Sequence, residues 1–125
     1  MTIRGTVTKG RQLGRRLGFP TANLEVADDL PLADGVYAAR VEVGGRRYRA
    51  LANLGTNPTL GTGGRRLLEI HLMGFEGGES LYGREITVEM GCRLREERRF
   101  ATLEELRRQM EADRAAVERT FETDR

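Results

Sequence analysis

The residues best suited to chemistry lie near the N-terminus, in a glycine- and arginine-rich segment that runs from Gly10 to Asn23 and reads GRQLGRRLGFPTAN. Glycine has no Cβ, so backbone N–H groups in such a segment can approach a phosphate closely, and the arginines add positive charge. The same composition is typical of a solvated turn, and the segment lacks the ending of a Walker A motif. Composition alone therefore indicates an anion site only weakly.

Two uncharged oxygen donors end this segment. Thr21 and Asn23 are two residues apart in a stretch that we expect to be extended, so their side chains point to the same face. A hydroxyl and an amide oxygen on one face can help to hold Mg²⁺, whose other ligands are then phosphate oxygens and water. With one histidine and one cysteine in the chain, a zinc site is close to excluded.

A glutamate and the single histidine share one face of an expected strand. In Leu67–Leu72, alternation places three aliphatic side chains on one face and Glu69 and His71 on the other. A carboxylate within hydrogen-bond reach of a hydroxyl can orient it and accept its proton, which makes Glu69 a candidate general base. The pattern alone equally allows a solvated glutamate at this position, and it favours a structural imidazole at His71.

Short strands and tight turns must position these groups. Alternating apolar residues predict strands at Ile3–Thr8, Val36–Val43, Arg46–Leu54, Leu67–Leu72 and Glu85–Leu94. Between the second and third of these, Gly44-Gly45 predicts a hairpin turn, because both turn positions need a positive φ.

The apolar period then changes to that of a helix. Thr102 and Glu105 are spaced as in a capping box. The hydroxyl oxygen of Thr102 accepts from the backbone N–H of Glu105, and the Glu105 side chain reaches back to the backbone N–H of Thr102. Behind it, one apolar stripe predicts a helix over 103–121; its members are Leu103, Leu106, Met110, Val117 and Phe121. Together the elements, five or six strands followed by one helix, favour a mainly β fold. We expect a small, closed, antiparallel, Greek-key-like barrel, taken as six-stranded, with one C-terminal α-helix.

The bulk properties fit one globular domain over residues 1–125. Its apolar fraction is 38%, and its net charge of +2 does not mark a nucleic-acid binder. No apolar run approaches the length of about 20 residues that spans a membrane. The single cysteine, Cys92, cannot form an internal disulfide, which fits a reducing compartment, and we expect a cytoplasmic location. We expect Cys92 itself to be a small core residue.

Seven blocks of sequence resemble riboflavin kinases, which occur alone or as the C-terminal half of bacterial bifunctional FAD synthetases. The most specific block is Gly14–Asn23, similar to the family signature G-R-x-L-G-F-P-T-A-N. The others follow in the family's order: Gly35-Val36-Tyr37-Ala38 after Pro31, Asn53 to Thr59, Leu68 to Leu72, Leu81-Tyr82-Gly83, Leu94 to Phe100, and Leu103 to Leu106 with Gln109 and Asp113.

The resemblance implies an ATP:riboflavin 5′-phosphotransferase, which transfers the γ-phosphate of Mg-ATP to the ribityl 5′-hydroxyl of riboflavin and forms FMN and ADP. Carried over position by position, it makes Glu69 the catalytic acidic residue, and Thr21 and Asn23 the residues that hold Mg²⁺ and the nucleotide phosphates. The remaining matches are Gly10, Arg15, Leu72 and Tyr82 at nucleotide positions and Arg95, Arg98 and Phe100 in the flap that contacts the flavin.

One departure concerns the nucleotide. Where the family often has Leu-Leu-Asp-Phe, this chain has Leu72-Met73-Gly74-Phe75, so a side chain near the nucleotide is missing. The alternative is a non-catalytic flavin- or nucleotide-binding β-barrel, against which the presence of Thr21, Asn23 and Glu69 together argues. A nucleic-acid-binding barrel is a further alternative, but the aromatic residues do not interleave with the arginines as in a stacking platform.

These inferences give a set of expectations about partners. We expect a monomer that takes riboflavin and ATP as small-molecule substrates, requires Mg²⁺, and binds neither nucleic acid nor membrane. The adenylyltransferase half of the bifunctional relatives carries an H-x-G-H motif, whereas this chain has only His71. We therefore expect it to form FMN and not FAD, as a module related to, or excised from, a bifunctional FAD synthetase.

Overall fold

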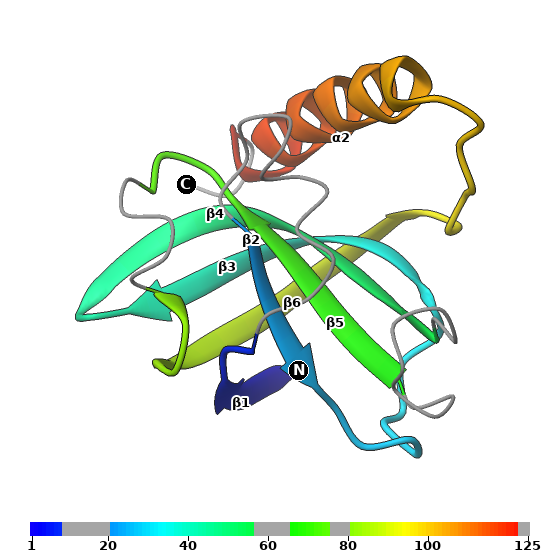
Figure 1. The fold of residues 1–125 in the computed structure, drawn as a ribbon. Coiled ribbons are helices and arrows are strands. Elements are labelled where there is room, and N and C mark those ends of the chain that lie inside the picture. The colour runs from blue at the N-terminus through cyan, green and yellow to red at the C-terminus, as the bar shows by residue number, and fades with distance from the viewer. Residues whose placement is uncertain (9–20, 57–65, 76–80, 123–125) are drawn as a thin grey trace.

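The computed structural model describes residues 1–8, 21–56, 66–75 and 81–122, which form one six-stranded antiparallel sheet and one helix (Figure 1). The strand order is β1-β6-β3-β4-β5-β2. The elements are β1 (Thr2–Thr6), β2 (Thr21–Glu25), β3 (Gly35–Val43), β4 (Arg46–Thr56), β5 (Arg66–Leu72), β6 (Glu85–Arg95) and α2 (Leu103–Glu122).

The strand order confirms the predicted Greek key. Strands β3, β4 and β5 pair consecutively, and β6 returns to lie beside β3. The two ends of the sheet then meet, since the N–H of Thr8, just after β1, donates to the carbonyl of Asn23 in β2 at 2.8 Å. The sheet is therefore a nearly closed barrel, as the sequence predicted.

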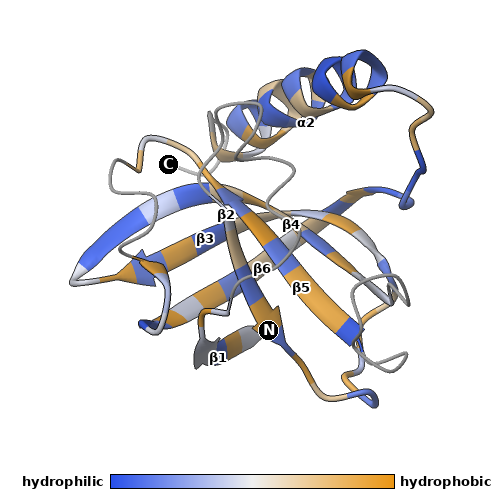
Figure 2. Ribbon diagram, viewed as in Figure 1, coloured by the Kyte–Doolittle hydropathy of each residue, from blue (hydrophilic) through white to orange (hydrophobic). Residues whose placement is uncertain are grey.

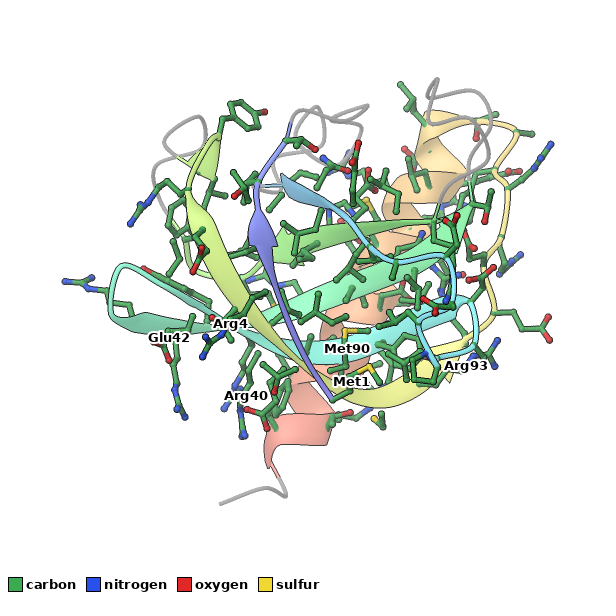
Figure 3. All side chains as sticks on the ribbon, turned by 90° about the horizontal axis from the view of Figure 1, so that it is seen from below. Met1, Arg4, Arg40, Glu42, Met90 and Arg93 are labelled. Carbon is green, nitrogen blue, oxygen red and sulfur yellow. The ribbon has the colours of Figure 1, made fainter. Side chains whose placement is uncertain are left out.

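Local sequence explains the turns and the strand ends. Gly44 and Gly45 both have positive φ, of 59° and 79°, as the predicted two-residue hairpin requires. At the start of the chain, the carbonyl of Met1 accepts from the N–H of Met90 at 2.8 Å, so β1 is fixed against the middle of β6 (Figure 3).

The barrel has an apolar interior and an outer face that is partly polar. Hydropathy alternates along β3 and β5 (Figure 2), and in β5 the side chains of Leu68, Ile70 and Leu72 are buried in the interior core. This confirms the predicted faces of that strand. The other face of β5 carries Glu69 and His71, so both candidate residues lie on the outside of the barrel.

Helix α2 lies across the outside of the barrel (Figure 1) and buries part of that outer face. Val117 and Phe121 pack on Val36, Ala38 and Leu51. Because Val36 and Ala38 belong to β3 and Leu51 to the neighbouring β4, the helix holds these two strands together on the outer face of the barrel. Polar side chains of the outer face lie next to this contact.

The prediction of the helix was right in extent but wrong in two details. Leu103 is 52% exposed and does not belong to the buried stripe, because it lies in the first turn, before the helix reaches the sheet. The N–H of Glu105 donates to Thr102 Oγ1 at 3.1 Å as expected, but the Glu105 carboxylate accepts from Ala101, one residue before the predicted partner.

Cys92 is exposed, so its prediction as a core residue was wrong; it stands on the outer face of β6, where its Sγ lies 3.7 Å from the hydroxyl of Thr120 in α2. Within the described ranges, α2 is too polar to cross a lipid bilayer and no other segment forms a long helix.

Candidate active site

A row of three polar side chains crosses the outer face of the barrel. Glu69 of β5 lies directly opposite Asn23 of β2 on one side and Asn53 of β4 on the other. Residues that face each other across paired strands project to the same face, so all three side chains point outward together. The strand register therefore brings the predicted Asn23 and Glu69 together and adds Asn53.

The two asparagines have unsatisfied polar atoms. The amide oxygen and nitrogen of Asn23 and the amide oxygen of Asn53 are buried, and within the described parts of the chain none of them has a hydrogen-bond partner. Asn23 as a whole is 0% exposed. Buried polar groups are nearly always hydrogen-bonded in folded proteins, so each of these atoms needs a partner from outside the described residues.

A second set of contacts joins Glu69 to Thr21. His71 Nε2 lies 3.2 Å from Glu69 Oε1, and His71 Nδ1 lies 3.4 Å from Thr21 Oγ1. Thr21 and His71 are buried, and Thr21 lies opposite His71 in the register between β2 and β5. The imidazole is thus part of the polar cluster that contains two of the predicted site residues.

Beyond Asn53 the line of paired residues reaches α2 through the apolar Val36. Asn53 pairs with Val36 of β3, and Val36 pairs in turn with Arg95 at the end of β6. The guanidinium of Arg95 donates to both carboxylate oxygens of Asp113 in α2, from Nε at 2.8 Å and from Nη2 at 2.7 Å. Arg95, predicted to contact the flavin, is therefore engaged in holding the segment after β6 against the helix.

The rest of the predicted flavin segment lies against the first half of α2. Arg98 donates to the side-chain oxygen of Gln109 at 2.9 Å, and its guanidinium lies 5.7 Å from the ring centre of Phe100. A hollow of about 350 Å³ opens here between the segment and the helix. Its lining residues are Arg98, Arg99, Phe100, Glu105, Arg108, Gln109 and Ala112.

Sequence patterns gave no signal for the position of Glu97. Its carboxylate lies against the backbone of Gly55, at a point where a Cβ on that glycine would overlap it. Although the residue as a whole is exposed, loss of water around the carboxylate raises the pKa of Glu97. The negative charge of Asp34 raises it further, Arg95 opposes the change, and Glu69 adds to it.

The predicted nucleotide residues fall into two groups. Gly10 and Arg15 lie outside the described residues. The side chain of Leu72 is buried in the interior core and that of Tyr82 packs against the same core, so Leu72 can meet a ligand only through its backbone.

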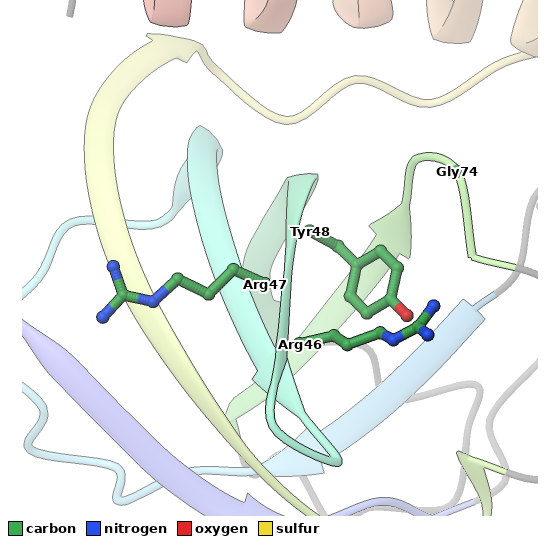
Figure 4. A pocket seen from close by; sticks show the side chains of 4 residues that line it. All are labelled: Arg46, Arg47, Tyr48 and Gly74. Atoms are coloured by element: carbon green, nitrogen blue, oxygen red, sulfur yellow. The ribbon is translucent and has the colours of Figure 1, made fainter. Parts of the chain in front are cut away.

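Gly74 borders a hollow of about 630 Å³ beyond the end of β5, together with Arg46, Arg47 and Tyr48 (Figure 4). Gly74 has a φ of 74°, and no atom of the described residues lies within 4 Å of where its Cβ would be. The missing side chain, noted from the sequence, therefore leaves open space at this end of the barrel.

The family model described as "Flavokinase: Riboflavin kinase" matches residues 1–121, and the chain therefore belongs to the riboflavin kinase family. The RNA-binding riboflavin kinase RibR of Bacillus subtilis is 42% identical over 120 residues, which are 96% of this chain and 51% of RibR. The bifunctional riboflavin kinase/FMN adenylyltransferase of Pseudomonas fluorescens is 42% identical over 115 residues, which are 92% of this chain and 36% of that protein. The chain thus spans about half or less of the length of these relatives.

Solved structures agree with the fold. Riboflavin kinase from Trypanosoma brucei superposes with a TM-score of 0.63 at 21% identity, covering 97% of this chain and 79% of that one. A Streptococcus pneumoniae structure titled macrolide-efflux protein gives a TM-score of 0.80 at 33% identity, covering 94% of this chain and 38% of that one. These likenesses confirm the predicted barrel with its C-terminal helix.

Proposed function

We propose that this chain is a riboflavin kinase that transfers the γ-phosphate of ATP to the ribityl 5′-hydroxyl of riboflavin, giving FMN and ADP. The single observation that carries the proposal is the cross-strand row Asn23–Glu69–Asn53. In it a carboxylate stands between two amides whose buried atoms have no hydrogen-bond partner among the described residues. Membership of the riboflavin kinase family supports the choice of substrates.

In this mechanism Glu69 orients the acceptor hydroxyl and takes its proton as the oxygen attacks the γ-phosphorus. Phosphoryl transfer needs an in-line hydroxyl and neutralised charge more than covalent help from the protein, so one carboxylate in hydrogen-bond reach is sufficient. The P–O bond to ADP breaks as the new bond to the ribityl oxygen forms. Glu69 is held on a strand paired on both sides, which fixes its position.

Thr21 and Asn23 would hold Mg²⁺ and the nucleotide phosphates. The donor set fits this role, because a hydroxyl and an orphaned, buried amide oxygen are neutral oxygen ligands that Mg²⁺ accepts alongside phosphates and water. No cluster of three or more acidic, histidine or cysteine side chains suited to a metal occurs among the described residues. The negative charge must then come from the phosphates. When bound, the ion would stabilise charge on the transferring phosphoryl group.

In this proposal the flavin would lie in the hollow bordered by Arg98 and Phe100, because an aromatic ring and a guanidinium offer stacking surface for a planar ligand. Arg95 would then shape this site through Asp113 and need not touch the flavin itself. Gly10 and Arg15 remain proposed contacts of the phosphates, and Leu72 and Tyr82 of the nucleotide.

The test is FMN formation by pure protein with riboflavin, ATP and Mg²⁺, with CTP compared and FAD monitored. We expect FMN without FAD, and Glu69→Gln to lower kcat by about 10²- to 10⁴-fold, the range for loss of a general base. Riboflavin binding, followed by flavin fluorescence, should persist in that variant. The matched control is Glu25→Gln, an exposed glutamate on the outer face of the neighbouring strand β2.

Tight flavin binding without any product in the wild-type protein would instead support the non-catalytic binding barrel. Unchanged turnover in Glu69→Gln would remove Glu69 from the role of base. A cytoplasmic location, a single domain over 1–125 and a monomeric state stay predictions.

A further inference from the structure

His71 lies between the proposed base and the proposed metal-binding residue. Its ring contacts Glu69, the proposed base, through Nε2 at 3.2 Å, and Thr21, the proposed metal and phosphate residue, through Nδ1 at 3.4 Å. The side chain is 9% exposed, and its backbone pairs with Thr21 on one side and Leu51 on the other. A ring held in this way has little freedom to turn.

Hydrogen-bond chemistry limits which tautomer serves both contacts. An ionised carboxylate can only accept, so the nitrogen facing Glu69 must carry the proton. A neutral imidazole then has a lone pair on Nδ1, which accepts the hydroxyl proton of Thr21. The Nε2–H tautomer is the neutral form that makes both hydrogen bonds.

We propose that His71 is a positioning residue that, as the Nε2–H tautomer, holds Glu69 and orients the hydroxyl of Thr21. This inference rests on the proposed function for its catalytic consequence. With its proton directed at Nδ1, the Thr21 hydroxyl presents its lone pairs to a cation. At Glu69, a bond to Oε1 lets Oε2 be the oxygen that meets the substrate hydroxyl, because a carboxylate offers two acceptor atoms.

Two substitutions separate the two contacts. The amide nitrogen of glutamine reaches the place of the imidazole Nε2, so His71→Gln keeps a donor for Glu69 and loses the acceptor for Thr21. The shorter asparagine reaches the place of Nδ1, so His71→Asn keeps a partner for Thr21 and loses the donor for Glu69. The pair thus forms a matched test within one site.

We expect His71→Asn to lower kcat by about 10- to 100-fold with the KM for Mg-ATP changed less than about threefold. That loss is typical of removing a group that orients a ligand-holding side chain. For His71→Gln we expect the opposite division, with a higher KM for Mg-ATP and a smaller loss of kcat. Equal losses in both variants, or none in either, would overturn the positioning role, and urea unfolding of both shows whether each variant folds.

The tautomer can be observed without turnover. Since His71 is the only histidine, ¹⁵N-detected NMR of the ligand-free protein gives one imidazole that needs no residue assignment, and couplings to the two ring carbon-bound protons tell Nδ1 from Nε2. A protonated Nε2 with an unprotonated Nδ1 is expected, and the Nδ1–H form or a doubly protonated ring refutes the proposal. If wild-type protein makes no FMN, the proposed function fails, while this measurement still decides the hydrogen-bonding arrangement.

Discussion

The contact between Arg95 and Asp113 should be the main electrostatic link between the barrel and α2, and Asp113→Ala tests it. Asp113 is 3% exposed, and its carboxylate accepts three hydrogen bonds: two from Arg95, at 2.8 and 2.7 Å, and one from Gln109 Nε2 at 2.9 Å. Truncation removes both acceptor oxygens, and with them all three hydrogen bonds, and leaves the guanidinium without its carboxylate.

The size of the effect follows from burial. Breaking a buried ion pair by removing one partner costs about 3–5 kcal/mol. The side chain of Arg95 is 21% exposed, so water restores part of its solvation, and we expect about 2–4 kcal/mol here. For a domain of this size, with a stability of about 5–15 kcal/mol, the variant should fold with a Tm lower by about 8–16 °C.

The assay is urea and thermal unfolding followed by far-ultraviolet circular dichroism. The control is Glu111→Ala, which removes a carboxylate from the same helix, two residues earlier, where the pair with Arg107 is exposed and its closest atoms are 3.6 Å apart. That change should cost less than about 0.5 kcal/mol. Equal destabilisation by the two variants would refute the reasoning. Recovery of stability in Arg95→Met with Asp113→Leu would support it, because buried ion pairs can be replaced by apolar packing.

Two further predictions concern Glu97 and Phe121. The pKa of Glu97 is raised in the folded state, so folding favours the protonated carboxyl over the charged carboxylate. The contribution of Glu97 to stability is therefore fully present at low pH and is lost as the pH rises through the folded pKa. Glu97→Gln should therefore raise Tm at about pH 7 and give no gain near pH 4; a gain that is the same at both pH values would contradict this. Phe121→Ala should lower the free energy of unfolding in urea by about 3–5 kcal/mol, since Phe121 is 6% exposed and its ring lies 4.6 Å from the guanidinium of Arg40. Phe121→Leu keeps most of the apolar volume and should cost less than about 1.5 kcal/mol. Similar losses in both variants would show that apolar volume is not what stabilises this contact.

The barrel could be predicted because its signals are local. Alternation identified five strands and the two-glycine hairpin, and a capping residue identified the start of α2. Strand β2 was only partly identified, because the alternation in Thr21–Glu25 extends over just five residues and its partner β5 is more than 40 positions away. Pairing at that distance depends on closure of the barrel and leaves no trace in a short window of sequence.

The candidate site was predicted in part for the same reason. Motif resemblance identified Thr21, Asn23 and Glu69, but not the role of Asn53, which depends on the register between β4 and β5. Asp113 did leave a signal that could have been used. It occupies a stripe position between Met110 and Val117, and a carboxylate at a buried helical position requires a partner such as Arg95.

The alternation in β5 has a consequence for errors in folding. The same seven residues supply core side chains on one face and Glu69 with His71 on the other. A slip of one residue in pairing would reverse both faces, placing a carboxylate in the apolar interior and leucines at the surface. A misregistered molecule would lose its stability and its polar row in one step. Proteases that degrade unstable chains would therefore also remove the molecules that lack the polar row. A purified sample that melts cooperatively should contain few molecules that are folded with this slipped register.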